Sequence, residues 1–177
     1  GSFKLVAGLQ QRQRLSDQRQ GKSWKQCRRT GKCPGKSLGG AKKGGSTPVN
    51  AMYRYADRVT EKGLVIMDTP GYDPMSVTGE FAGGATICAF TTGRGSCFGT
   101  AHCPTIKLAS NTPMYERMSE DMDINCGQII DGEKTIEEMG QIIFQRILEV
   151  ASGDKSKSEA LGVGYNEYVP WPIGVMA

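Results

Sequence analysis

The chain has 177 residues, enough for one compact domain with extensions and a sizeable core. No apolar run approaches the ~20 residues that cross a bilayer and no signal-peptide segment is present, so we expect a cytoplasmic protein with no membrane contact. Gly1-Ser2 is typical of a protease-cleavage scar, so the chain is expected to be cut from something longer.

The net charge of +4 is unevenly distributed. Residues 1–47 carry twelve Lys and Arg and one acid, Asp17, whereas residues 48–177 carry ten Lys and Arg and seventeen acids. A basic arm of this kind can bind nucleic acid. This one has only two aromatic residues, Phe3 and Trp24, and no recognition motif, which disfavours nucleic-acid binding.

The six cysteines, at positions 27, 33, 88, 97, 103 and 126, form no C-x-x-C pair. Metal sets built from Cys27 and Cys33, or from Cys97, His102 and Cys103, stay open, but reduced thiols are favoured. His102 is the only histidine, so a two-histidine metal site is excluded and no catalytic triad can be assigned.

Residues 1–35 are polar and repetitive, which predicts an irregular basic arm or linker, and a Gly- and Lys-rich linker follows to residue 45. A helix is then predicted from Thr47 to about residue 62. Thr47 is a good N-cap, Pro48 suits the first turn, and apolar residues follow at helical spacing. Those apolar residues are Val49, Met52, Tyr53, Ala56 and Val59.

Two strands are predicted next, at residues 64–67 and 85–90. The first is four continuous apolar residues, as in a strand buried on both faces. Between the strands, Asp73 as N-cap and Pro74 are expected to begin a helix that ends at Gly83-Gly84.

The C-terminal half continues the alternation of strands and helices. Residues 105–109 predict a third strand with Lys107 at its centre, where burial is costly unless the charge is paired. Residues 110–113 are expected to cap a short helix to about residue 118, and residues 122–125 predict a fourth strand. The tail, residues 165–176, is expected to pack on the domain through Trp171.

The longest helix is predicted over residues 135–151, where Thr135 and Glu138 form a capping box. Its broad apolar set is expected to cover the sheet: Ile136, Met139, Ile142, Ile143, Phe144, Ile147, Leu148 and Val150. Alternating strands and helices predict an α/β fold. We expect an open, mainly parallel sheet with helices on both faces, a Rossmann-like three-layer arrangement, plus the basic arm.

The sequence after the strand predicted at residues 85–90 has the composition of an oxyanion-binding loop. Thr91, Thr92, Gly93, Arg94, Gly95 and Ser96 offer hydroxyls, backbone N–H groups and one guanidinium. No Gly-Lys-Ser/Thr follows, so the loop is not a P-loop. A tight turn with a solvated arginine remains the alternative.

Ligands of open parallel sheets bind at the carboxyl ends of the strands. Polar residues follow each predicted strand there: Asp68 and Thr69, then the Arg94 loop, then Ser110 and Asn111, then Asp123 and Asn125. Ordinary turn and cap chemistry is the alternative for each of them taken alone.

Several segments together resemble the altronate/galactarate dehydratase family. They are Lys36–Gly39, Lys43–Pro48, Phe90–Ser96, Phe98-Gly99, Pro104–Ala109, Met122–Asn125 and Ala151–Gly153. The resemblance covers the C-terminal domain of that family, here residues 36–177. It implies a sugar-acid hydro-lyase that forms a 2-keto-3-deoxy acid from a substrate such as altronate or galactarate. Sulfolactate sulfo-lyase is similar as well.

The resemblance also implies iron(II) or another divalent cation, with ligands partly outside this chain, and further domains of the same enzyme. The expected ligand is a small polyhydroxy carboxylate, and a homo-oligomer is left open. We expect Lys107, Arg94 and Asp68 to be catalytic. The expected substrate-binding residues are Thr91, Thr92, Gly93, Gly95, Ser96, Asn111, Asp123 and Asn125. A non-catalytic anion-binding module is the second hypothesis.

Overall fold

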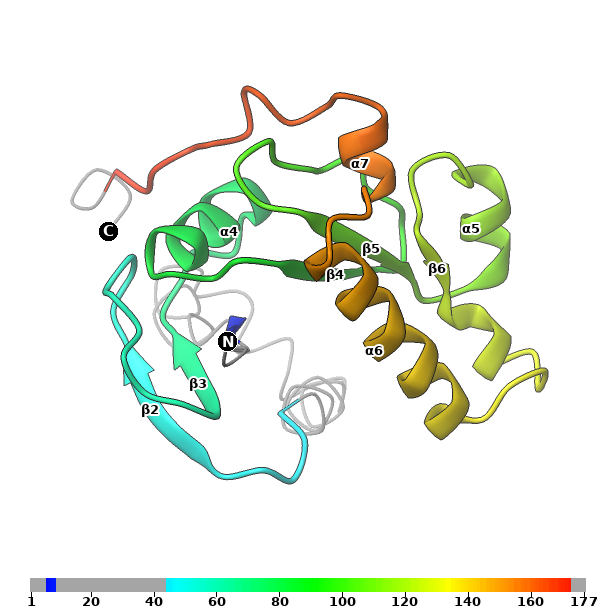
Figure 1. Cartoon of the computed structure of the whole chain (residues 1–177), viewed down its shortest axis with the longest axis horizontal. Helices are drawn as coiled ribbons and strands as arrows, with labels where there is room; N and C mark the ends of the chain where they lie inside the picture. Colours follow the sequence, from blue (N-terminus) through cyan, green and yellow to red (C-terminus); the bar gives the residue numbers. More distant parts are fainter. Residues whose placement is uncertain (1–5, 9–43, 173–177) are drawn as a thin grey trace, which may run out of the picture. The chain divides into compact units, whose positions relative to one another are not determined.

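The computed structural model describes residues 6–8 and 44–172. They form an α/β structure with two three-stranded parallel sheets, ordered β1-β3-β2 and β4-β5-β6 (Figure 1). The predicted α/β class with parallel strands is therefore confirmed. The chain divides into two compact units: the first runs to Ala85 and resumes at Pro170, and the second is Thr86–Val169. The predicted basic arm, 1–35, lies outside the described residues except for 6–8.

The sheet of the first unit is built around β3 (Leu64–Met67), which pairs in parallel with β1 (Val6–Gly8) and β2 (Val49–Tyr53). Its central place explains the unbroken apolar sequence, because a middle strand that is covered on both faces has no polar side. Val65, Ile66 and Met67 are buried. The predicted buried strand at 64–67 is confirmed.

The helix predicted over residues 47–62 is wrong, because residues 49–53 form strand β2. The helical spacing of its apolar residues was coincidental, and pairing with β3 decides the local structure. The chain then turns at Ala56, whose φ of +62° no helix interior adopts. Tyr53 anchors the returning segment, since its hydroxyl accepts hydrogen bonds from the backbone N–H groups of Thr60 and Glu61 at 3.1 and 3.0 Å.

Helix α4 (Asp73–Ala82) ends at Gly83-Gly84 as predicted, but its N-cap is Tyr72 and Asp73 lies within the first turn. The predicted packing of the tail is confirmed for Trp171. Its ring meets that of Tyr55 edge to face at a centroid distance of 5.4 Å, and its backbone N–H donates to the Tyr55 hydroxyl. Residues 173–177 lie outside the described part.

The second unit holds β4 (Cys88–Thr92), β5 (Thr105–Ala109) and β6 (Ile124–Asn125). The third strand is where the sequence predicts it. The strand predicted at 85–90 is shifted towards the C-terminus, because Thr91 and Thr92 pair with Leu108 and Ala109 and so extend the ladder. The last strand is shorter than predicted and contains only residues 124 and 125.

Four helical segments accompany this sheet: α5 (Thr112–Arg117), η1 (Cys126–Ile129), α6 (Ile136–Ala151) and α7 (Lys157–Ala160). The predicted capping box of α6 is present, with Glu138 N–H donating to Thr135 Oγ1 and Thr135 N–H donating to the Glu138 carboxylate. A second capping box, Ser156 with Glu159, opens α7. No helix in the described part is both long and apolar enough to span a bilayer.

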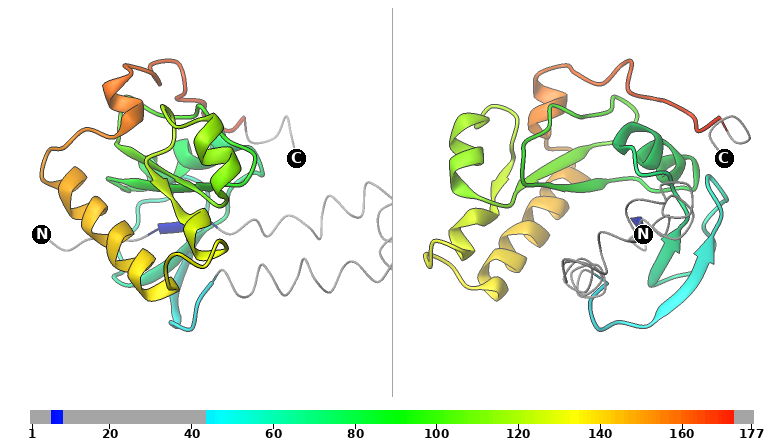
Figure 2. Two further views of the ribbon diagram at one scale, coloured as in Figure 1. Left: turned by 90° about the vertical axis from the view of Figure 1, so that its right-hand side faces the viewer. Right: turned by 180° about the vertical axis from the view of Figure 1, so that it is seen from behind.

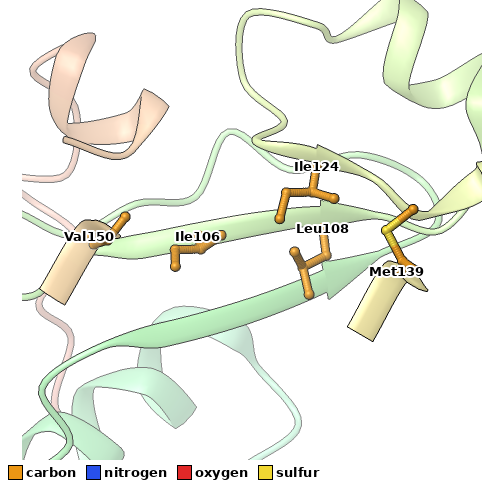
Figure 3. Packing of buried hydrophobic residues seen from close by; sticks show 5 residues of the cluster. All are labelled: Ile106, Leu108, Ile124, Met139 and Val150. Carbon is orange, nitrogen blue, oxygen red and sulfur yellow. The ribbon is translucent and has the colours of Figure 1, made fainter. Parts of the chain in front are cut away.

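Helices lie on both faces of β4-β5-β6, as predicted: α6 on one face, α5 and α7 on the other (Figures 1 and 2). Ile106, Leu108 and Ile124 pack against Met139 and Val150 of α6 (Figure 3). The apolar stripe of α6 is narrower than predicted. Three of its expected core residues, Ile136, Ile142 and Phe144, are exposed because they lie beyond or beside this contact.

Candidate functional site

The loop after β4 is held in shape by its own hydroxyl groups. Thr92 Oγ1 accepts a hydrogen bond from Gly95 N–H at 3.2 Å, and Ser96 Oγ accepts one from Phe98 N–H at 3.1 Å. Gly95 has a φ of +96°, and a Cβ at this position would collide with the sulfur of Met118 at the end of α5. Glycine is therefore favoured here by the backbone conformation, and a larger residue would also force the flexible Met118 side chain to move.

Arg94 lies exposed in this loop. Among the described residues it has neither an ion-pair nor a hydrogen-bond partner. Thr91, near the end of β4 and three residues before Arg94, is exposed as well. A guanidinium has five N–H donors in a planar fork that matches a carboxylate. The loop thus holds, on a braced backbone, a cation that no residue of the described ranges pairs.

Asn111 joins this loop to the end of the neighbouring strand. Its side-chain oxygen caps α5 by accepting from Met114 N–H at 3.0 Å, and its side-chain nitrogen donates to the Gly93 carbonyl at 3.0 Å. The backbone N–H of Ser110 also donates to the Thr92 carbonyl. The residues that follow β4 and β5 therefore lie together, as the topology of a parallel sheet requires.

Asn125 extends the same edge at β6. Its side-chain nitrogen donates to Thr112 Oγ1 at 3.0 Å and its side-chain oxygen accepts from Gly127 N–H at 2.9 Å. The Thr112 hydroxyl also contacts the carboxylate of Asp131, an exposed residue that the sequence did not single out. The edge thus carries one carboxylate, two amides and the arginine loop.

Lys107 is fully buried on the face of β5 opposite Ile106 and Leu108. Its ammonium lies 3.5 Å from the Asp121 carboxylate, on the segment between α5 and β6. The two groups form an ion pair, but their separation exceeds the usual length of a hydrogen bond between charged groups. The ammonium has no hydrogen-bond acceptor within the described chain.

Asp123 is fully engaged as a backbone brace. One carboxylate oxygen accepts from Lys107 N–H at 2.8 Å and the other from Lys157 N–H at 3.0 Å. Its own N–H donates to the Lys107 carbonyl. The carboxylate thereby fixes β5, the approach to β6 and the start of α7 relative to one another.

Asp68 belongs to the first unit, where it follows β3, is exposed, and donates its N–H to the Tyr53 carbonyl. The buried Thr69 hydroxyl beside it accepts from Ser76 Oγ at 2.7 Å, and Ser76 also reaches Glu80 at 3.3 Å. Burial raises the pKa of the Glu80 carboxyl to about 7, although the Ser76 hydrogen bond lowers it.

The described residues contain no group of three His, Cys, Asp or Glu side chains able to hold a metal ion. His102 is exposed and its ring meets that of Tyr168 edge to face at 5.1 Å. Burial raises the pKa of the Cys103 and Cys126 thiols, which makes these thiols poorer ligands and nucleophiles. Cys27 and Cys33 lie outside the described residues.

The profile of a protein family, D-galactarate/altronate dehydratase, C-terminal, matches residues 32–176. The chain belongs to this family. Galactarate dehydratase (L-threo-forming) of Escherichia coli is 42% identical over 120 residues, which are 68% of this chain and 23% of that protein. Altronate dehydratase of Bacillus subtilis is 37% identical over 118 residues, 67% of this chain and 24% of that protein.

A third relative of this dehydratase-family chain is (2R)-sulfolactate sulfo-lyase subunit beta of Chromohalobacter salexigens. It is 31% identical over 135 residues, 76% of this chain and 34% of that protein. The chain therefore spans about a quarter of the length of the dehydratases it matches and about a third of the sulfo-lyase subunit.

In this dehydratase-family domain, sequence reasoning found the residues at the sheet edge but missed three ionisable side chains: Asp121, Asp131 and Glu80. The carboxylate of Asp121 meets Lys107, and that of Asp131 meets Thr112. Neither follows a predicted strand directly, so the strand-end rule could not find them. Glu80 could have been suspected from its spacing of four from Ser76 on the predicted helix.

Proposed function

We propose that this chain is the carboxylate-binding C-terminal part of a lyase that removes water from a sugar acid and leaves a 2-keto-3-deoxy acid. Family membership supports the reaction class. The observation that carries the proposal is Arg94, exposed and without a partner in the described part of the chain, on a loop braced by Asn111 at the carboxyl ends of parallel strands. The names of the relatives suggest galactarate or altronate as the substrate.

The proposed reaction needs positive charge at the substrate carboxylate. Loss of the proton beside the carboxylate forms an enediolate, departure of the neighbouring hydroxyl group as water gives an enol, and tautomerisation gives the ketone. The enediolate carries more negative charge than the acid, so preorganised donors at the carboxylate stabilise it. Arg94 would bind this group in a bidentate manner, with Thr91 and loop N–H groups as further donors.

The other predicted site residues have different proposed roles. Thr92, Ser96 and Asn111 would position the loop, because each already uses its side chain to shape it. Asn125 and Asp131 would bind substrate hydroxyl groups at the same edge, and Asp123 would act through Lys107 as a positioning residue. The catalytic role expected for Asp68, which belongs to the first unit, stays a prediction from the sequence.

Iron(II) or another divalent cation is part of the proposal only for a longer enzyme. The described residues do not by themselves make a metal site, since no three suitable side chains come together in that part of the chain. No step of the reaction is therefore assigned to a metal here.

A related lyase with a different leaving group is the second candidate. The match to a sulfolactate sulfo-lyase subunit favours it, because the same carboxylate-stabilised carbanion can expel sulfite instead of water. A non-catalytic anion-binding module would use the same arginine loop without further chemistry.

A thermal-shift assay tests the proposed function. Galactarate, altronate and sulfolactate are each added to the 177-residue chain and to Arg94→Ala, with Arg117→Ala as an exposed arginine control of the same unit. We expect at least one acid to raise the Tm of the wild type and of Arg117→Ala but not of Arg94→Ala. An equal rise in Arg94→Ala, or no rise with any acid, would contradict the proposal.

A further inference from the structure

In the second unit, the ammonium of Lys107 is buried, and the described residues do not replace the hydrogen bonds that water would give it. Its side chain is 0% exposed, yet its three N–H donors find no acceptor in the described chain. An ammonium removed from water without hydrogen bonds is costly, and attraction to a carboxylate at 3.5 Å compensates only in part. Residues 6–8 and 44–172 therefore supply no acceptor atom at hydrogen-bond distance to this ammonium.

Nearby acceptors are already in use. Both oxygens of Asp123 bind backbone N–H groups. The carbonyls of Ser119 and Met122, on the same segment as Asp121, accept from the Lys157 ammonium, which also lies 5.5 Å from the centre of the Tyr115 ring. These oxygens accept from other donors, and none of them lies within hydrogen-bond distance of Lys107 Nζ.

Asp121, which forms the ion pair with Lys107, is the member of the pair that reaches solvent, with 27% of its side chain exposed. Two more buried side-chain oxygens have no hydrogen-bond partner among the described residues: Thr105 Oγ1 and Ser158 Oγ. Thr105 is two residues before Lys107 and so shares its face of β5, while α7, which carries Ser158, contacts β5. Two of these groups, Thr105 Oγ1 and Lys107 Nζ, therefore lie on one face of the strand, and the third belongs to a helix that packs against it.

We propose that Lys107 forms an internal carboxylate subsite in which Asp121 is a displaceable counter-ion. A ligand carboxylate would enter past the partly exposed Asp121, supply hydrogen-bond acceptors at charged-bond distance, and turn the Asp121 side chain to solvent. Thr105 and Ser158 would donate to the remaining oxygens. The inference rests on the proposed function only in taking a carboxylic acid as the ligand.

Calorimetric titration of the 177-residue chain with malonate tests the subsite without requiring turnover. Removing the competing charge in Asp121→Asn is expected to lower the Kd for malonate about tenfold. Glu120→Gln, a neighbouring exposed carboxylate, is the matched control and is expected to leave the Kd unchanged. The double variant Asp121→Asn/Lys107→Met is expected to lose the gain.

An unchanged or higher Kd in Asp121→Asn would overturn the subsite, and so would a gain that survives in the double variant. A crystal structure of the wild type grown with malonate covers the case in which a variant misfolds. It is expected to place a carboxylate oxygen within hydrogen-bond distance of Lys107 Nζ, whereas a water molecule there with Asp121 unmoved would overturn the inference. Failure of sugar acids to bind through Arg94 would contradict the proposed function alone.

Discussion

Glu80 and Lys107 show two ways in which this chain treats an ionisable side chain away from water. Lys107 keeps a counter-ion, Asp121, at 3.5 Å. Glu80 has hydroxyl neighbours, since Ser76 lies between it and the buried Thr69. Hydroxyls compensate a carboxylate less than a cation does, so burial favours the protonated form of Glu80. The two sites should respond differently to neutral substitutions.

Glu80→Gln is predicted to stabilise the protein at alkaline pH. Since burial raises the pKa of Glu80 from 4.5 to about 7 in the folded state, the free energy of unfolding falls as pH rises through this window. Gln imitates the protonated form, so the stability of the variant should exceed that of the wild type by about 3 kcal/mol at pH 8 and match it below pH 4.5. Urea unfolding at both pH values measures this.

The exposed Glu137→Gln on α6 serves as the control for that series, and its stability should follow the wild type at both pH values. A Glu80→Gln variant less stable than the wild type at pH 8 would mean that the carboxylate is charged and needed in the folded protein.

At the scale of elements, the close approach of α5 and η1 fixes the carboxyl edge of the second sheet. A Cβ on Gly127 would lie 2.7 Å from the Asn111 Cα, inside the backbone that caps α5. Asn111 holds the arginine loop, and Asn125 caps η1 and binds Thr112. One glycine thus permits the contact on which several site residues depend.

Gly127→Ala is predicted to cost about 3 kcal/mol or more, because the obstructing atoms are backbone and cannot rotate away. Gly140→Ala is the matched control. Position 140 lies inside α6, where an added Cβ would have nothing within 4 Å, so alanine there should stabilise the protein by about 0.5–1 kcal/mol. Chemical denaturation of both variants tests the pair, and equal effects would refute this account of Gly127.

Local signals explain which elements the sequence could predict. The capping box of α6 and the Asn111 cap of α5 act within four residues, and β3 is a continuous apolar strand. Strand β2 could not be predicted, since its pairing with β3 overrides a helical pattern. The Arg94 loop follows from composition, whereas the Lys107–Asp121 contact needs the folded chain.

At the scale of the whole molecule, the first unit is discontinuous in sequence. Its described strands and α4 all precede residue 86, while Trp171 returns to Tyr55 after the entire second unit. The Tyr55 hydroxyl donates to the Met75 carbonyl and accepts from Trp171 N–H, so one side chain connects three segments of this unit.

Trp171→Ala is predicted to loosen the first unit selectively. Loss of the edge-to-face ring contact should cost about 1 kcal/mol beyond the lost burial. Amide hydrogen exchange should accelerate in α4 and around Tyr55 while β4, β5 and α6 keep their protection. Tyr165→Ala, an exposed tyrosine of the second unit, is the control. Equal acceleration in both units would contradict a local role for Trp171.

The return of Trp171 has a consequence for biosynthesis. The second unit is encoded by one uninterrupted stretch, Thr86–Val169, so all of its residues leave the ribosome before Trp171 does. The first unit completes its contacts later, although its strands are synthesised first, because the ring contact between Tyr55 and Trp171 cannot form until Trp171 has been synthesised. During translation the unit that is synthesised later can thus be the first to complete its contacts.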